Sequence, residues 1–548
     1  MGGKKIETEC LIIGTGIAGT TCALLAAKSG LNVTLVTKRS DPAMTNTNRA
    51  QGGIVYSGAG DNPELLAQDI LNAGRNMNSI EAVTFLAENG PRIVAEILIE
   101  ELNVNFTHLR GSEDESFDLT REGAHSLNRI LYSADHTGRE IEKALINALK
   151  KQEHVKTITN ATVVDLITLQ HHATDIQARY ILEDRCMGAY VFMEDTKEVD
   201  MILAQYTVLA TGGLGDIYIH STNEIGTVGD GIVMARRAGA RVKNMEFIQF
   251  HPTALYIPGA RRFLISEALR GEGARLKNIR GEYFMEKYNK DLKDLAPRDE
   301  VTVAIWEEMI QNKDDHVLLD VAGFVDEDVE QRFPDIYATC KEAGIDITRE
   351  SVPVVPAAHY FCGGVHVNNH GRTTLAGLYA VGEVSCTGLH GANRLASTSL
   401  LEGLVWGYFA AKDIAGRIYL GETVKSKMLH CTQDWISTGN VENEDPALIA
   451  QDWITLKSTM WNYVGIVRTQ PRLKRAIEDL RHMYLRLDDF YKETPLSKDI
   501  ISLFLGLQSA IIVAEAALRN NRSIGCHLIR TSQGSDKEFP ALRSNYSH

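Results

Sequence analysis

The fold is decided by residues 10–19, which read Cys-Leu-Ile-Ile-Gly-Thr-Gly-Ile-Ala-Gly. A short apolar strand runs into a G-x-G-x-x-G turn, and residues 20–29 are then predicted to form a helix and residues 31–36 a second strand. In such a βαβ unit the first two glycines let the backbone approach a pyrophosphate, and the third lets the helix pack on the strand. The free N–H groups at the start of the helix attract phosphate oxygens. The pattern therefore predicts a Rossmann-like dinucleotide site.

Two later segments are predicted to add strands to the same sheet. Residues 208–215 and 377–383 each read as an apolar run that ends in a glycine turn. Between them, the chain at 244–354 is charged, rich in helix signals and has turns of its own, which is typical of an inserted domain. We expect an α/β protein with a discontinuous Rossmann-like domain, 1–243 and 355–420, and an inserted α+β capping domain, or lid, at 244–354.

A helical bundle is predicted for residues 421–548. Apolar residues recur there at the spacing of one buried helix face, and a second such face precedes it. The tail after Thr531 is polar, and we expect it to fray. The first face consists of Leu473, Ile477, Leu480, Tyr484 and Leu487, and the second of Trp453, Leu456, Met460 and Val464.

Composition narrows the class of protein. The chain has 548 residues, too many for one core, so two or three domains are expected. Its formal net charge of −14 argues against nucleic acid or an anionic membrane as a partner. The N-terminus lacks the apolar core of a signal peptide, and no run reaches the ~18 apolar residues of a membrane span, so we expect a cytoplasmic protein. The eight cysteines are scattered without a C-x-x-C pair, which favours reduced thiols without a structural metal or iron–sulfur cluster.

Three further features bear on the dinucleotide. The second strand ends Val36-Thr37-Lys38, without the acidic residue that many Rossmann proteins use for a ribose hydroxyl. The loop at 46–53, Asn-Thr-Asn-Arg-Ala-Gln-Gly-Gly, suits a phosphate and the edge of a flavin, with a solvated loop as the alternative. Residues 397–399, Ser-Thr-Ser, are predicted to cap a long apolar helix. The N-terminus of that helix, aimed at a flavin pyrimidine ring, would stabilise the negative charge of the reduced ring.

Together these segments resemble the flavoprotein family of succinate dehydrogenase, fumarate reductase and L-aspartate oxidase. The resemblance covers residues 8–530, and it rests on several motifs that follow the glycine turn in one order. They are Ala50-Gln-Gly-Gly, Ala210-Thr-Gly-Gly, Gln249-Phe-His-Pro-Thr, Glu267-Ala-Leu-Arg-Gly-Glu-Gly, Leu295-Ala-Pro-Arg-Asp, Pro356-Ala-Ala-His-Tyr and Gly388-Leu-His-Gly-Ala-Asn-Arg-Leu-Ala-Ser.

The resemblance implies FAD as the cofactor, with Lys38 in place of the missing ribose acid. Membrane-bound members attach FAD covalently through a histidine where this chain has Asn46, so FAD is expected to be bound without a covalent link. Aspartate oxidases often carry serine at that position. The predicted cofactor residues are Gly14, Thr15, Gly16, Ile17, Ala18, Gly19, Lys38, Asn46, Thr47, Asn48, Arg49, Ala50, Gln51, Gly52, Gly53, Thr162, Val163, Asp230, Glu383, Ser399 and Leu400.

A small dicarboxylate is the expected class of substrate. It needs an anion clamp at each end, and the arginine fork binds a carboxylate bidentately. For each of the two arginines and two histidines alone, a surface salt bridge or a satisfied histidine is the alternative, but all four lie inside the family motifs. The candidates are Arg298 in the lid segment, Arg394 ahead of the capped helix, His251 and His359 in expected loops, and Gln249 and Ser266 as supporting hydrogen-bond partners.

The segment 121–126, Arg-Glu-Gly-Ala-His-Ser, separates members of the family. Aspartate oxidases are similar to one another in an Arg-Glu-Gly-x-His-Ser motif, whereas respiratory subunits have a glutamine-containing segment. Glu122 can pair with the α-ammonium of aspartate, a group that succinate lacks. The alternative is an exposed Glu122 without a role in binding.

The resemblance therefore implies oxidation of L-aspartate to iminoaspartate, with electrons passing from FAD to oxygen, giving peroxide, or to fumarate. Arg298 is the expected proton-transfer group, while Arg394, His251 and His359 hold the carboxylates and Glu122 positions the amino group. Iminoaspartate would pass to quinolinate synthase in de novo NAD synthesis. Two alternatives stay open: a soluble fumarate reductase or succinate dehydrogenase-type subunit, and a non-catalytic flavin-binding scaffold.

Overall fold

The computed structural model describes residues 3–109, 116–325, 328–424, 429, 431–437, 439–442 and 445–530. In it the strand that begins the motif, residues 10–13 of β1, lies in the interior of a seven-stranded sheet. The order is β6-β2-β1-β9-β8-β7, and β17 also pairs with β9. Cys10 lies between Val33 and Tyr206 in two parallel ladders, so the predicted βαβ unit is confirmed. The strands are β1 Lys5–Ile13, β2 Val33–Val36, β6 Val155–Ile158, β7 Ala161–Thr168, β8 Cys186–Met193, β9 Glu198–Leu209 and β17 Leu378–Ala380.

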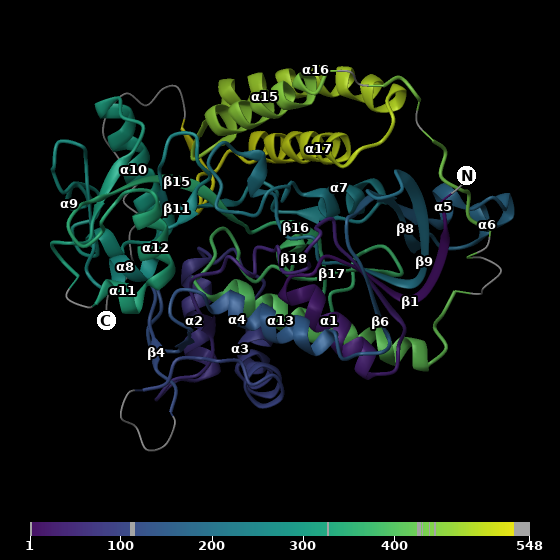
Figure 1. Ribbon diagram of the computed structural model, residues 1–548, viewed down its shortest axis with the longest axis horizontal. Helices are drawn as coiled ribbons and strands as arrows, with labels where there is room; N and C mark the ends of the chain where they lie inside the picture. Colours follow the sequence, from purple (N-terminus) through teal and green to yellow (C-terminus); the bar gives the residue numbers. More distant parts are fainter. Residues whose placement is uncertain are drawn as a thin grey trace.

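Helices cover both faces of this sheet (Figure 1). On one side lie α1 (Ile17–Lys28), α4 (Thr137–Leu149) and α13 (Thr398–Tyr419), and on the other lies the C-terminal bundle. Two glycines of α13 allow it to approach α1 closely: a Cβ on Gly407 would meet the carbonyl oxygen of Ala18 at 2.6 Å. A Cβ on Gly403 would meet a methyl of Ile17 at 2.9 Å. The backbone of α13 therefore lies directly on the first turn of α1.

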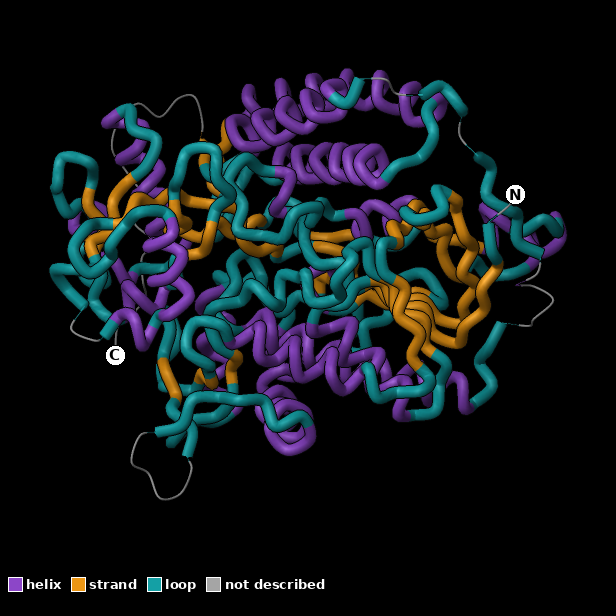
Figure 2. Tube along the Cα trace, in the orientation of Figure 1, coloured by secondary structure: helices purple, strands orange, loops and turns teal. Residues whose placement is uncertain are grey.

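The lid segment forms a second body with its own core. A five-stranded sheet, ordered β12-β11-β15-β14-β13, packs with short helices around a separate cluster of buried apolar residues (Figure 2). Its last strand continues to residue 361, beyond the expected boundary at 354. The elements are β11 Ile248–Leu255, β12 Phe263–Leu264, α8 Glu267–Gly271, β13 Arg275–Lys277, α9 Met285–Tyr288, η3 Lys293–Leu295, α10 Arg298–Asn312, β14 Val317–Asp320, α11 Val329–Arg332, α12 Pro334–Glu342 and β15 Val352–Phe361.

The C-terminal bundle consists of α15 (Ala447–Val464), α16 (Gln470–Glu493) and α17 (Lys498–Arg519). Both predicted faces are confirmed: each is buried except for Trp453 and Tyr484, which are partly buried. By length and composition α17 could cross a membrane, but 72% of its most apolar window is buried inside the protein, as in a core helix. The tail after Thr531, which we expect to fray, lies outside the described residues.

Smaller elements connect these layers. A parallel pair, β19 and β20, joins the start of α16 to the last described residues. The others follow in chain order: β3 Ile54–Val55, α2 Pro63–Ala73, α3 Ile80–Ile93, η1 Val94–Glu101, β4 Leu119–Thr120, β5 Ile130–Leu131, α5 Leu169–His172, α6 Ile176–Ile181, η2 Gly215–Ile217, α7 Asp230–Arg237, β10 Val242–Lys243, β16 Gly364–His366, η4 Gly382–Val384, β18 Ser385–Cys386, β19 Val467–Thr469 and β20 Leu528–Arg530.

Candidate active site

One large cavity runs from the start of α1 to the edge of the lid. Its walls come from the first turns of α1 and α13, from the loop at 46–53 and from strands of both sheets, among them β1, β11 and β15. Loops fill much of the space between the two sheets (Figure 2). The cavity therefore joins the predicted dinucleotide site to the predicted substrate residues.

Most of the predicted cofactor residues line this cavity. Gly19, Asn48 and Thr162 do not. A Cβ on Gly19 would meet the carbonyl oxygen of Gly14 at 2.1 Å, so this glycine is required for packing of α1 on β1. The residues that line the cavity are Gly14, Thr15, Gly16, Ile17, Ala18, Lys38, Asn46, Thr47, Arg49, Ala50, Gln51, Gly52, Gly53, Val163, Asp230, Glu383, Ser399 and Leu400.

The polar groups of this wall fit a flavin dinucleotide. The N-cap residue of α1, Gly16, has no side chain to cap the helix, and Thr47 accepts one hydrogen bond from the N–H of Ile17 at 3.0 Å. Gln51 Oε1 is buried with no partner among the described residues, which is costly unless a ligand donates to it. Lys38 Nζ forms an ion pair with Asp230 at 2.7 Å, which places a cation and a carboxylate near the end of β2. A ribose and its phosphates would find both donors and acceptors here.

The N-terminus of α13 differs from its prediction. Ser397 is the N-cap residue, but its hydroxyl does not cap the helix. Its backbone is left-handed, with φ 56°, and its hydroxyl donates instead to Glu122 Oε2 at 2.7 Å. Because the side chain is used in that contact, the first N–H groups of α13 receive no hydrogen bond from it. They are available to an anionic group in the cavity, since Ser399 and Leu400 line it.

His251 and His359 lie on neighbouring strands, β11 and β15, rather than in the loops that we expected from adjacent prolines and glycines. The ladder between these strands shifts register after His251, where Pro252 offers no N–H, so a bulge accommodates the proline. The two imidazole rings lie 5.1 Å apart, and both line the cavity.

Both imidazoles are neutral hydrogen-bonding groups. Burial and the nearby Arg298 lower the pKa of His251 well below its usual value, and burial and Arg394 do the same to the pKa of His359. His251 Nδ1 lies 3.2 Å from the backbone nitrogen and 3.1 Å from the carbonyl oxygen of Thr253, so this nitrogen is occupied by the local backbone in either tautomer. His359 Nδ1 is bonded to the Thr222 hydroxyl at 2.9 Å. In each ring Nε2 is left for a ligand oxygen.

Arg298 and Arg394 are both hydrogen-bonded to one side-chain amide. Gln249 Oε1 accepts hydrogen bonds from Arg394 at 3.1 Å and from Arg298 at 3.4 Å. Gln249 does not line the cavity, so it positions the arginines from behind, whereas Ser266 does line it. Burial and the second guanidinium lower the pKa of Arg394. Two guanidinium groups brought together by one neutral amide form a site that favours an anion, although Glu267 already balances part of the charge of Arg298.

Sequence reasoning identified neither Thr222, the partner of His359, nor three residues around the arginines, which are Glu267, Arg270 and Tyr360. Glu267 on α8 accepts a hydrogen bond from Arg298 Nε at 2.5 Å, and Arg270 lies 3.9 Å from the same carboxylate oxygen. Arg394 lies over the ring of Tyr360 at 4.5 Å. The motifs at Glu267 and Pro356 contain all three, but their spacing along the chain gives no sign of which side chain meets which arginine.

Glu122 lies between the cofactor loop and the arginines. Its side chain is 8% exposed and lines the cavity. Burial raises its pKa, although Arg298 and the Ser397 hydroxyl act in the opposite direction. Among the described residues, no Lys, Arg or His nitrogen comes within ion-pair distance of it. A cation bound beside this carboxylate would favour its ionised form.

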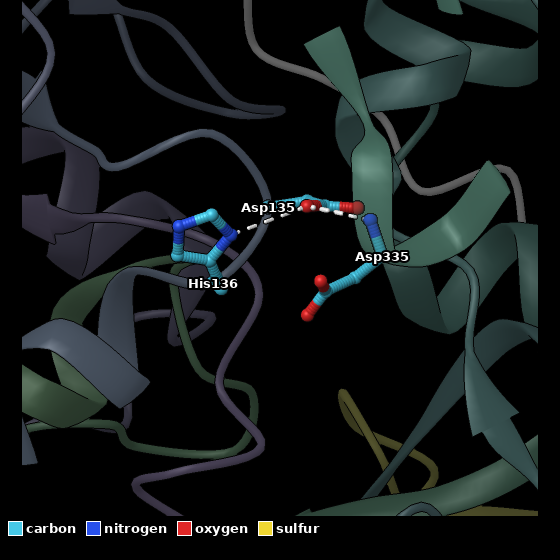
Figure 3. Close-up of side chains that lie close together, drawn as sticks. All are labelled: Asp135, His136 and Asp335. Carbon is cyan, nitrogen blue, oxygen red and sulfur yellow. Dashed lines mark hydrogen bonds and ion pairs between the residues drawn. The ribbon is translucent and has the colours of Figure 1, made fainter. Parts of the chain in front are cut away.

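Asp135, His136 and Asp335 form a tight group at the joint between lid and sheet domain, shown in Figure 3. Their potential ligand atoms lie within 4.8 Å of one another. Asp135 accepts hydrogen bonds from the backbone N–H groups of Asp335 and Ile336, at 3.1 and 2.8 Å, in the first turn of α12. Asp335 also forms an ion pair with Arg139. These contacts connect the lid to the sheet domain.

Comparisons of sequence and structure show which known proteins this chain is similar to. A family model described as an FAD binding domain matches residues 9–400. The chain is 40% identical to L-aspartate oxidase of Pseudomonas aeruginosa, over 96% of this chain and 95% of that one. It is 38% identical to the chloroplastic L-aspartate oxidase 2-b of Nicotiana tabacum, over 94% of this chain and 80% of that one. A structure of E. coli quinol fumarate reductase has a TM-score of 0.85 at 25% identity, covering 98% of this chain and 94% of that one.

Proposed function

The chain belongs to the L-aspartate oxidases of the succinate dehydrogenase and fumarate reductase flavoprotein family, and on that premise we propose that it oxidises L-aspartate to iminoaspartate with FAD as cofactor. The single observation that carries the proposal is the position of Glu122 beside Arg298 and Arg394 in one cavity. Those three charges match the ammonium and the two carboxylates of aspartate.

The cavity wall from α1 to α13 would hold FAD, which when bound takes a hydride from the substrate Cα and passes two electrons on. We propose that it is held without a covalent link, because Asn46 has no nucleophilic side chain for one. The Asn46 carboxamide oxygen already accepts a hydrogen bond from the Glu224 N–H at 2.7 Å. If the proposal is right, acid precipitation leaves the yellow colour in the supernatant; flavin that stays with the washed pellet would contradict it.

The substrate is held by groups from both domains. Arg394 offers a bidentate fork to one carboxylate, and the Nε2 atoms of His251 and His359 donate to carboxylate oxygens. Arg394 is fixed by Gln249, Tyr360 and a 3.2 Å hydrogen bond to the Ser399 hydroxyl, so little rotamer entropy is lost on binding. Ser266 lines the same part of the cavity and can supply a further hydroxyl.

Glu122 selects an amino acid over a plain dicarboxylate. Its carboxylate is buried and accepts only the Ser397 hydroxyl among the contacts described above. The α-ammonium of aspartate would supply the missing cation, which succinate does not carry. The same contact orients Cα, because it fixes the third substituent of that carbon.

Arg298 is the group that would move the proton. It is the first residue of α10, and the contacts of Arg75 with Asp299 and Glu300, at 2.7 and 3.3 Å, hold this end of the helix against the sheet domain. Glu267, which also lines the cavity, connects Arg298 to Arg270, which does not. Since arginine is normally protonated, the charged Glu267 carboxylate at 2.5 Å would hold the Arg298 guanidinium in position while it exchanges a proton with the substrate.

Oxygen, giving hydrogen peroxide, and fumarate are the proposed electron acceptors. The similarity to fumarate reductases over most of the chain supports fumarate in that role. We place the enzyme in the cytoplasm, where iminoaspartate would pass to quinolinate synthase for de novo NAD synthesis.

The test is to assay purified holoenzyme for peroxide with L-aspartate and, separately, with succinate. Peroxide with aspartate and little with succinate is the expected result. Equal rates with both would favour a succinate dehydrogenase-type subunit, and no rate with either would favour a flavin-binding scaffold.

A further inference from the structure

Gly123 lies where the segment 121–126, which carries Glu122, meets the lid. A Cβ on Gly123 would lie 2.2 Å from Glu267 Oε1, closer than the 3.0 Å that a real Cβ contact requires. Glu267 is the lid carboxylate that accepts a hydrogen bond from Arg298 Nε at 2.5 Å. The partner of Arg298 therefore occupies the space that any side chain at position 123 would fill.

The local backbone does not require a glycine at this position. The φ of Gly123 lies outside the left-handed region that favours glycine, whereas the next residue, Ala124, has a left-handed φ of 66°. A turn that needed glycine for its conformation would have it at 124. What Gly123 supplies is space for the side chain of Glu267.

The segment 121–126 is fixed to the sheet domain on its other side. Asp69 of α2 accepts hydrogen bonds from the N–H and the hydroxyl of Ser126, at 2.9 and 2.8 Å. His125 Nε2 lies 3.0 Å from the carbonyl oxygen of Ala396, just ahead of α13. The segment cannot move away from the lid without breaking these contacts.

Glu122 restrains the same segment from a second direction. A Cβ on Gly52 would lie 2.8 Å from Glu122 Oε1, and Glu122 Oε2 accepts from the Ser397 hydroxyl at 2.7 Å. Movement of the segment would therefore disturb the cofactor loop at 46–53 and the start of α13. A side chain at position 123 would displace the lid carboxylate instead.

We propose that Gly123 is a positioning residue: the space left by its missing side chain accommodates Glu267 and thereby places Arg298 beside the segment that holds the substrate ammonium. The proposal rests on the proposed function, in which Arg298 moves the proton and Glu122 holds the amino group. It adds a steric contact through which the segment that selects the substrate sets the position of the group that acts in the chemical step.

The first test is Gly123→Ala in FAD-loaded enzyme. Flavin reduction at saturating L-aspartate should slow by about ten- to a hundred-fold, because a displacement of about 1 Å can cost on the order of 10²-fold in rate. Absorbance titration with succinate should give an affinity close to that of the parent, since the contacts that hold Arg394 do not involve this segment. A parent-like rate would overturn the proposal.

Gly271→Ala is the matched control. Gly271 ends α8, the helix that Glu267 begins, and a Cβ there would meet no described atom within 4 Å. It adds the same methyl group to open space, so its rate and its succinate affinity should equal those of the parent. An equal loss of rate in Gly271→Ala and Gly123→Ala would show that the close contact at 123 is not the cause.

Fumarate reduction by chemically reduced enzyme separates this role from that of Glu122. If the methyl acts through Glu267 and Arg298, fumarate reduction should fall together with aspartate oxidation, because both directions need the proton. If the methyl acts by displacing Glu122, fumarate reduction would be retained, since fumarate carries no ammonium, and the proposal would be wrong.

Glu267→Asp gives a reciprocal test. Its carboxylate is one methylene shorter and would not reach a methyl at position 123, while its weaker contact with Arg298 should itself lower the rate. Gly123→Ala should then cost little more on this background, whereas losses that multiply would mean that the two positions act independently. A methyl that harmed FAD binding on both backgrounds would show that the segment itself needs the glycine, against the proposal.

A crystal structure of FAD-loaded Gly123→Ala tests the contact without any turnover. Glu267 Oε1 should have moved by at least about 0.8 Å, from 2.2 Å to the 3.0 Å that the methyl requires, with residues 121–126 in place. A displaced segment beside an unmoved Glu267 would overturn the proposal. A parent enzyme that reduces fumarate but gives no peroxide with L-aspartate would count against the proposed function alone, because the structure and the fumarate assay would still decide the role of Gly123.

Discussion

Arg298 donates a hydrogen bond through Nε to Glu267 Oε2 at 2.5 Å, and both side chains are almost completely buried. Arg298 begins α10 and Glu267 begins α8, so the pair is carried entirely by the lid. Arg298 lowers the pKa of Glu267 against the effect of burial, which keeps that carboxylate charged. A charged acceptor on Nε leaves the outer nitrogens of Arg298 for the substrate and for Gln249. Arg298, held by Glu267, is therefore the candidate for the chemical step, whereas Arg394 is expected only to bind the substrate.

We expect Arg298→Lys to lose flavin reduction by L-aspartate while succinate still binds. A lysine cannot contact Glu267 and the substrate together, so proton transfer is lost, and such transfers contribute roughly 10²–10⁴-fold. Stopped-flow flavin reduction at saturating aspartate measures the rate, and absorbance titration with succinate measures binding. Reduction at near the parent rate would remove Arg298 from the chemical step.

Arg394→Lys is expected to affect binding more than rate. Arg394 belongs to the sheet domain and is present whether or not the lid moves, and lysine cannot reproduce its bidentate fork. The loss of a charge-assisted contact of this kind is about 1.5–3 kcal/mol, or ten- to over a hundred-fold in affinity. The same two measurements apply, with the opposite pattern: a raised dissociation constant for succinate and a smaller change in the saturated rate. Unchanged succinate affinity would show that Arg394 does not clamp a carboxylate.

Glu122→Gln should separate amino-acid oxidation from dicarboxylate reduction. The amide can still accept from Ser397 but has no charge for the α-ammonium, so kcat/KM for L-aspartate should fall about ten- to a hundred-fold. Fumarate carries no ammonium, and its reduction by chemically reduced enzyme should be retained. Equal loss of both activities would mean that Glu122 supports the structure of the loop instead.

The pH dependence of aspartate binding follows from the raised pKa of Glu122. The carboxylate pairs with the ammonium only when it is ionised, and burial shifts its protonation to a higher pH than for an ordinary glutamate. KM for L-aspartate should therefore rise as the pH falls through that raised pKa, at pH values where exposed carboxylates are still charged. Glu122→Gln should remove this part of the profile. A parent profile identical to that of the variant would contradict the assignment.

Local patterns predicted much of this molecule, and contacts between distant segments account for the rest. The glycine turn at 10–19 specified the βαβ unit, and apolar spacing specified the faces of α15 and α16, because each depends on neighbours along the chain. His251 was placed in a loop because Pro252 usually ends a strand, whereas the pairing of β11 with β15 tolerates it at a bulge. The hydroxyl of Ser397 was assigned to a cap, and only the folded chain brings Glu122 to it.

Arg298 and Arg394 also have partners that residue spacing could not predict. Both could be chosen from the sequence, since anion clamps need arginine. Gln249 and Tyr360 meet Arg394 only where the lid approaches the segment before α13, and Glu267 meets Arg298 only through the folding of the lid itself. Side-chain contacts of this kind depend on tertiary geometry, which residue spacing does not carry.

The contacts of Asp135 with the lid give the last prediction. It concerns the fraction of molecules in which the lid places Arg298 in the cavity. Asp135 lies in the sheet domain and accepts hydrogen bonds from the first two N–H groups of the lid helix α12. Figure 3 shows the one from Asp335. Beside it, Arg332 of the lid lies 4.4 Å from the ring centre of Tyr132. Removing a helix cap costs about 0.5–2 kcal/mol. Here that loss falls on the contact between lid and sheet domain, because the cap and the helix belong to different domains.

We therefore expect Asp135→Ala to lower kcat/KM for L-aspartate by roughly two- to thirty-fold, the equivalent of that energy, with FAD affinity unchanged. Asp328→Ala is the matched control. Asp328 caps α11 in the same way, but both partners lie inside the lid, so its loss should cost stability without changing the position of Arg298. Steady-state kinetics and flavin fluorescence titration measure the two quantities. If both variants lowered kcat/KM alike, the effect would come from general loosening of the lid, and Asp135 would have no special part in its closure.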